Sequence, residues 1–127
     1  MKNYLIVFFG AGLGGALRYW SSSAVYKFLP PTFPYGTLFV NVIGSFILGI
    51  VMYYLDYKKL INADTRIFLT IGFCGGFTTF STFSYETLNL LRDNEYLIAS
   101  INIIANVLLT LIALFAAYKL SKLLSGV

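Results

Sequence analysis

The sequence predicts an all-α membrane protein with four transmembrane helices, the third of which is broken near its middle. Of the 127 residues, 58% are hydrophobic and only 11% are charged, whereas soluble domains carry about 25% charged residues. Four runs without charge cover residues 3–17, 28–55, 67–85 and 97–118. About 20 mostly apolar residues suffice to cross ~30 Å of hydrocarbon. The third run also contains adjacent glycines followed by hydroxyl residues, which disfavours an unbroken helix.

We expect the helices near residues 3–25, 35–56, 66–91 and 95–122. The connections are too short for a second domain, so residues 1–127 form a single four-helix transmembrane domain. Lysines and arginines lie at helix ends, six on one predicted side and three on the other. This pattern favours cytoplasmic termini and explains the net charge of +4 without a nucleic acid partner. A single cysteine excludes an internal disulfide, and the absence of histidine argues against a zinc or haem site.

The first predicted helix begins with an apolar stretch that could also pass for a secretory signal, but we expect it to stay, because small residues lead into further helix-compatible sequence. Its GAGLGG, residues 10–15, matches a nucleotide-binding pattern, yet the first carboxylate of the chain is Asp56, too distant to hold a ribose. Gly10 and Gly14 instead form a G-x-x-x-G pair, which lets two membrane helices approach closely.

Arg18 closes this glycine-rich stretch beside Tyr19 and Trp20. Two interpretations stay open. The guanidinium is either an interfacial anchor within an aromatic belt or an anion attractor at the mouth of a pore.

The second predicted helix begins after a proline-rich loop and carries Asn41 and Ser45 on one face, four residues apart. A single buried asparagine is often only a hydrogen bond between helices. Asn41 is not alone, however, because the fourth helix carries polar residues as well.

The third predicted helix contains GFCGGFTTFSTF at residues 72–83. Its glycines precede Thr78 and Thr79, so we expect the helix to break there. Non-helical backbone at membrane depth is tolerated only inside protein or along a cavity, and broken helices often hold ions. The sequence therefore predicts an ion site at this break.

Phe77, Phe80 and Phe83 recur every three residues, which predicts one shared side of the helix after the break. Such a side either packs against lipid and core or presents positive ring edges to a small anion. Glu86 follows one turn later and is either a coupling site or a paired structural group; its role is left open.

The fourth predicted helix presents Asn102, Asn106 and Thr110 at intervals of four, which places them along one line parallel to the helix axis. A line of amides and a hydroxyl suits a permeating solute that loses its water. It equally suits hydrogen bonding between helices.

Three stretches together resemble the Fluc/CrcB family of small dual-topology fluoride channels: GGALRYW at 14–20, YGTLFVNVIGSF at 35–46 and GFCGGFTTFSTFS at 72–84. The resemblance covers all four helices and the total length. It implies a fluoride-selective ion channel that exports fluoride passively across the cell (inner) membrane and confers fluoride resistance. The pores would lie at the interface of an antiparallel homodimer. A partner is also plausible physically, since four helices leave little room to enclose a pore and a two-fold dimer doubles each lining group.

By resemblance, Phe80 and Phe83 would contact fluoride through their ring edges, and Asn41 would be a pore-lining amide. Backbone carbonyls of Gly75 and Thr78 would hold a structural sodium ion at the centre of the dimer. Further pore-lining and vestibule positions would be Thr79, Ser81, Thr82, Asn106, Thr110 and Glu86, with Arg18 at the vestibule. The resemblance assigns no role to Asn102, so its role is left open.

The alternative function is a small four-helix multidrug (cation) exporter, which needs a carboxylate deep in its binding site; Glu86 is the only nearby candidate. A third hypothesis is a membrane scaffold that transports nothing. We do not expect an enzyme, because the chain has no histidine and its hydroxyls lack an activating partner. The expected partners are the fluoride ion, membrane lipid and a second copy of the chain.

Overall fold

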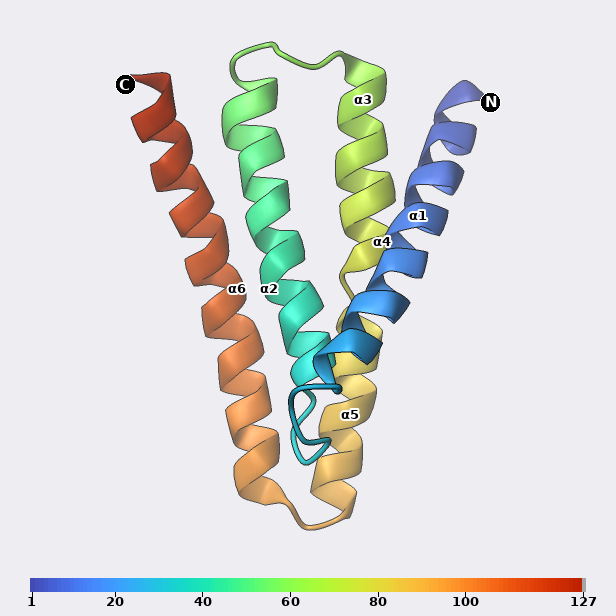
Figure 1. Ribbon diagram of the computed structural model, residues 1–127, viewed down its shortest axis with the longest axis vertical. Helices are drawn as coiled ribbons and strands as arrows, with labels where there is room; N and C mark the ends of the chain where they lie inside the picture. Colours follow the sequence, from blue (N-terminus) through green and yellow to red (C-terminus); the bar gives the residue numbers. More distant parts are fainter. Residues whose placement is uncertain (127) are drawn as a thin grey trace.

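The computed structural model describes residues 1–126, which form four helical rods and contain no strand (Figure 1). The first rod is α1 (Lys2–Val25). The second rod is α2 (Tyr35–Ile50), which continues without interruption as the π-helical η1 (Val51–Asp56). The fourth rod is α6 (Tyr96–Ser125). These bounds agree closely with the predicted ranges.

The third rod consists of two parts separated by two extended residues. Its first part joins α3 (Ala63–Ile67), the π-helical η2 (Phe68–Cys74) and the short α4 (Gly75–Phe77). Its second part is α5 (Phe80–Arg92). The predicted break in the third helix is thereby confirmed.

Among the described residues, three of the four rods are long and apolar enough to cross a membrane: Tyr35–Asp56, Ala63–Arg92 and Tyr96–Ser125. The first rod is not among them, although α1 has 24 residues. Its glycines, its serines and Arg18 dilute its apolar content. At about 1.5 Å per residue α1 is still ~36 Å long, so a fourth crossing stays a prediction.

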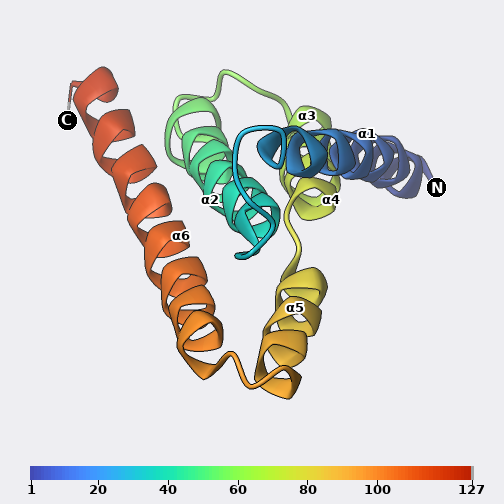
Figure 2. The same ribbon diagram turned by 60° about the horizontal axis from the view of Figure 1, so that its bottom comes forward.

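The rods form two packed pairs that meet at α2. The most extensive contacts join α2 to α6, and α1 to η2 and α4. Figures 1 and 2 both show α1 lying across the first part of the third rod, with α6 beside α2. The two ends of the described chain lie at the same end of the bundle (Figure 1), which agrees with the predicted even number of crossings.

Glycines bring α1 into close contact with the third rod. Gly10 and Gly14 are both buried in this contact. A methyl group on Gly10 would lie 2.7 Å from the Phe68 carbonyl oxygen, and one on Gly14 would overlap the Phe73 carbonyl oxygen. The predicted G-x-x-x-G contact is therefore confirmed, and its partner is the third rod of the same chain.

The glycines of the third rod do not themselves form the break, which corrects part of the prediction. Gly75 and Gly76 are helical residues of α4. A methyl group on Gly76 would lie 2.5 Å from the Ala11 carbonyl oxygen, so this glycine serves close packing on α1. The break falls at Thr78 and Thr79, whose backbones are extended with ψ of 162° and 118°.

Candidate site at the break in the third helix

The two threonines at the break end one helix and begin the next. Thr78 Oγ1 donates to the carbonyl oxygen of Cys74 at 2.9 Å, and the Thr78 amide donates to the same oxygen at 3.0 Å. One residue later, Thr79 Oγ1 accepts a hydrogen bond from the Thr82 amide at 3.1 Å and so caps α5. A threonine hydroxyl can satisfy backbone groups locally in this way. The Thr79 hydroxyl therefore provides the cap with which the second part of the third rod begins.

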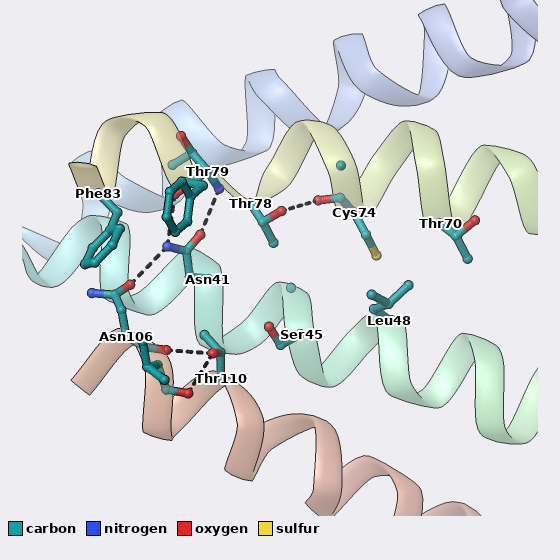
Figure 3. Close-up of a pocket in the computed structure, with 14 residues that line it drawn as sticks. Asn41, Ser45, Leu48, Thr70, Cys74, Thr78, Thr79, Phe83, Asn106 and Thr110 are labelled. Carbon is teal, nitrogen blue, oxygen red and sulfur yellow. Dashed lines mark hydrogen bonds between the residues drawn. The ribbon is translucent and has the colours of Figure 1, made fainter. Parts of the chain in front are cut away.

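Asn41 of α2 holds the break open. Its Nδ2 donates to the Thr79 carbonyl at 3.1 Å, and its Oδ1 accepts from the Thr79 amide at 2.8 Å (Figure 3). In an unbroken helix the Thr79 amide would donate to the Gly75 carbonyl. The Gly75 carbonyl has therefore lost its usual helical partner.

Asn41 is also bonded to the polar line of α6. The Asn41 Nδ2 group donates a second bond, 3.0 Å long, to Asn106 Oδ1. Asn106 Nδ2 in turn donates to Asn102 Oδ1 at 2.9 Å and to the Asn102 carbonyl at 3.0 Å. Asn102 and Asn106 are buried. Of the two interpretations of this line, the bonds between helices favour hydrogen bonding for the two asparagines.

Thr110 continues the line but does not bond to another helix in the described residues. Its hydroxyl donates to the Asn106 carbonyl of its own helix at 2.6 Å. It is half-buried and faces the same side as Asn106 (Figure 3).

A groove of about 350 Å³ opens where α2, the break and α6 meet (Figure 3). It collects polar side chains from α2 and α6, the extended backbone of the break and the two rings that follow. Eight of the predicted site residues line this groove: Asn41, Gly75, Thr78, Thr79, Phe80, Phe83, Asn106 and Thr110.

Phe80 and Phe83 stand beside each other on α5, with ring centroids 5.4 Å apart. Their exposures differ, since Phe83 is 8% exposed whereas Phe80 is 78% exposed. Phe77 does not share their side, which corrects the prediction. It lies before the break, is 5% exposed, and stacks on Phe73 with centroids 5.8 Å apart. The extended residues turn the chain between the two groups of rings, so a spacing of three no longer means one side.

Arg18 reaches the break from α1. Its Nη1 donates to the Thr78 carbonyl at 3.2 Å, and the residue is half-buried. Arg18 is not among the residues that line the groove. The guanidinium places a positive charge next to the extended backbone of the break. This position differs from both predicted ones, an interfacial anchor and an anion attractor at the mouth of a pore.

Ser81, Thr82 and Glu86 lie outside the groove lining. The hydroxyls of Ser81 and Thr82 lie 3.3 and 3.0 Å from Thr79 Oγ1 and support the cap of α5. Glu86 Oε1 accepts from Thr37 Oγ1 at 2.8 Å. The other oxygen, Oε2, is buried without a hydrogen-bond partner among the described residues. Glu86 thus pairs with the beginning of α2, about two turns from the break.

Sequence reasoning missed several residues around the site. Thr70 and Leu48 line the groove beside Ser45, and Thr37 and Thr87 bond to Glu86 and Asn102. Ser45 was recognisable from its helical spacing to Asn41. The others depend on how the rods are placed in space, so no spacing along the chain reveals them.

The fold and the groove define a class of protein: a small all-helical protein of long apolar helices with a polar groove at a broken helix, an arrangement that suits the handling of ions. Within this class the chain belongs to the CrcB family, because the family model described as "CrcB-like protein, Camphor Resistance (CrcB)" matches residues 5–118. The family resemblance predicted from the three sequence motifs is thereby confirmed.

Curated relatives match this chain over most of its length. The chain is 48% identical over 124 residues to the fluoride-specific ion channel FluC of Pyrococcus abyssi, covering 96% of this chain and 98% of that protein. It is 50% identical over 112 residues to the fluoride-specific ion channel FluC of Geotalea daltonii, covering 88% and 90%. It is 52% identical over 106 residues to that of Geobacter metallireducens, covering 84% and 85%.

Proposed function

We propose that this chain is a fluoride-selective ion channel of the cell (inner) membrane that lets fluoride leave the cell passively. The observation that carries the proposal is the groove at the helix break, which joins two phenylalanine rings to hydroxyls and amides. Relatives named fluoride-specific ion channels match almost the full chain, which identifies the ion.

The chemistry of the groove suits passage of a small anion. Among the described residues, its lining holds no Lys, Arg, Asp or Glu. An anion would therefore meet hydroxyls and ring edges, which attract it, without a full positive charge that would trap it. Conduction needs binding that is strong enough to admit the ion and weak enough to release it. The hydroxyl of Ser45 makes no hydrogen bond within residues 1–126, so it is free to donate to the anion (Figure 3).

The working unit in this proposal is an antiparallel homodimer within the lipid. Phe80 is 78% exposed at the edge of the groove, and a second copy would cover it and close the groove into a pore. Further large apolar side chains are exposed along the outer side of α6, among them Ile104, Leu108 and Phe115. The antiparallel orientation rests on the family resemblance alone.

A structural sodium ion is the proposed cofactor. The Gly75 carbonyl has lost its helical partner, and a methyl group on Gly75 would meet only the Thr70 carbonyl, at 3.9 Å. The Thr78 carbonyl accepts from Arg18 and keeps a second lone pair. The residues therefore fit a cation held by carbonyl oxygens, two from each chain. Arg18 lies close enough to modulate the affinity of such a site.

The alternative, a multidrug (cation) exporter, is not favoured by the site. Such an exporter needs a carboxylate within its binding site, and Glu86, the sequence candidate, is bonded to Thr37 outside the groove lining.

An efflux experiment tests the proposal. The purified protein is reconstituted in liposomes loaded with potassium fluoride, valinomycin is added, and a fluoride electrode follows the release. Parallel liposomes contain potassium chloride. We expect rapid release of fluoride and none of chloride. Folded protein that releases no fluoride, or releases both ions alike, contradicts the proposed function.

A further inference from the structure

Asn102 is a fully buried amide in the second turn of α6, with 0% of its surface exposed. A buried amide is costly unless its polar groups are hydrogen-bonded. Asn102 does not line the groove, so contact with a passing ion does not explain it. Its hydrogen bonds run in two directions, and both end at the backbone of the same segment.

The first series of hydrogen bonds, here called the first arm, connects Asn102 to Phe83. Asn102 Nδ2 donates to Thr87 Oγ1 at 3.0 Å, and Thr87 Oγ1 donates to the Phe83 carbonyl at 2.7 Å. Thr87 is 8% exposed, so water competes little for these bonds. Asn102 is thereby connected to the backbone of a residue that carries one of the two rings.

The second series of hydrogen bonds, the second arm, connects Asn102 to Thr79, the residue that precedes Phe80. Asn102 Oδ1 accepts from Asn106 Nδ2 at 2.9 Å, and Asn106 Oδ1 accepts from Asn41 Nδ2 at 3.0 Å. Asn41 holds both the amide and the carbonyl of Thr79. The two arms therefore hold residues 79–87 at both ends, and Phe80 and Phe83 lie between these ends.

In the second arm, both hydrogens of each donating side-chain amide already form hydrogen bonds. Each Nδ2 group carries two hydrogens. Those of Asn41 point to Thr79 and Asn106, and those of Asn106 point to the carbonyl and the Oδ1 of Asn102. An anion could bind either amide only by breaking this chain of bonds.

We propose that Asn102 and Asn106 are positioning residues, which fix the height and rotation of α5 against α2 and so set the place of the Phe80 and Phe83 rings in the groove. Neither residue binds the ion. This inference rests on the proposed fluoride channel function, and it assigns to Asn102 a role that the sequence left open.

Substitutions at Thr87 test the first arm. Thr87→Val keeps the shape of the side chain and removes the hydroxyl, whereas Thr87→Ser keeps the hydroxyl and removes a methyl group. We expect Thr87→Val to lower fluoride efflux per folded protein about tenfold, in line with a buried partner left unpaired, and Thr87→Ser to restore most of the rate. Ser121→Ala on α6 is the control, since the Ser121 hydroxyl is buried but bonds only to Ala117 of its own helix.

A double-variant cycle separates positioning from general damage. If Asn102 acts through Thr87, then Asn102→Leu combined with Thr87→Val slows efflux hardly more than Asn102→Leu alone. Losses that multiply would overturn the connection. Equal efflux rates for Thr87→Val, Thr87→Ser and the wild type would overturn the role itself.

Hydrogen exchange measured by mass spectrometry on the same proteins gives a readout that does not depend on transport. We expect Asn102→Leu to accelerate exchange of the amides of residues 79–83 roughly tenfold, and Ser121→Ala to leave them unchanged. Unchanged exchange in Asn102→Leu contradicts the positioning role even where efflux falls. Wild-type vesicles that release no fluoride would refute the proposed function, while the exchange data would still decide whether the two arms hold the segment.

Discussion

At the scale of single residues, the site divides into side chains that shape the groove and side chains that face it. Some side chains form hydrogen bonds to backbone groups at the break, namely those of Thr78, Thr79 and Asn41. Ser45 faces the groove without a hydrogen bond within residues 1–126. Residue types alone predicted that hydroxyls and amides gather here. They could not distinguish these two roles, because the roles depend on which partner each group meets in space.

Replacing Ser45 by alanine removes the free hydroxyl without touching the bonds that hold the break. A hydrogen bond to a charged partner contributes about 1.5–3 kcal/mol, so we expect fluoride efflux from liposomes to fall about tenfold or more. Ser23→Ala on α1 is the matched control, because the Ser23 hydroxyl is exposed and bonds to its own helix at Tyr19. An unchanged rate in Ser45→Ala would remove this hydroxyl from the proposed path.

At the scale of elements, the sequence predicted the positions of the helices and of the break well, because apolar runs and their interruptions are local properties. The cause of the break was predicted less well. Gly75 and Gly76 stand next to it, yet they are helical, and the interruption occurs one turn later at threonines that α2 holds through Asn41. Likewise, the three-residue spacing from Phe77 to Phe83 indicated one shared helix face, because a periodic pattern does not detect two extended residues within the run.

Gly14→Ala tests the contact between α1 and the third rod. The added methyl group would overlap the backbone carbonyl of Phe73, which cannot move away as a side chain tip could. We expect a destabilisation of about 1–3 kcal/mol, seen as a lower unfolding temperature in detergent. Gly15→Ala is the control, since nothing lies within 4 Å of its added carbon. That change should be neutral or stabilising by about 0.5–1 kcal/mol, and an equal loss in both variants would contradict the packing explanation.

At the scale of the whole molecule, the proposed dimer would cover the exposed ring of Phe80 and close the open groove. The sequence contains no direct record of such a partner. Its composition predicted apolar helices, but lipid and a second copy both favour apolar surfaces, so the assembly could be taken only from the family resemblance.

Replacing sodium by a large organic cation tests the proposed assembly and its cofactor together. If carbonyls of Gly75 and Thr78 hold sodium between two copies, removing sodium should weaken the dimer, because a ligand stabilises the state that binds it. We then expect monomers to appear at protein concentrations at which the dimer is intact in sodium. Light scattering during size-exclusion chromatography measures the mass in each buffer. A dimer of equal stability in both buffers contradicts the sodium site, and a monomer in both contradicts the dimer.

The central claim is that fluoride passes along the groove at the break, beside the rings of Phe80 and Phe83. Fluoride efflux from liposomes holding Phe83→Ile or Phe80→Ile tests this claim most directly, since isoleucine keeps an apolar side chain of comparable bulk and removes the ring edge. Size-exclusion chromatography confirms that each variant keeps the fold and mass of the wild type. We predict that both folded variants lose most of their fluoride efflux. Wild-type efflux in both would contradict the account, because the rings would then serve packing alone.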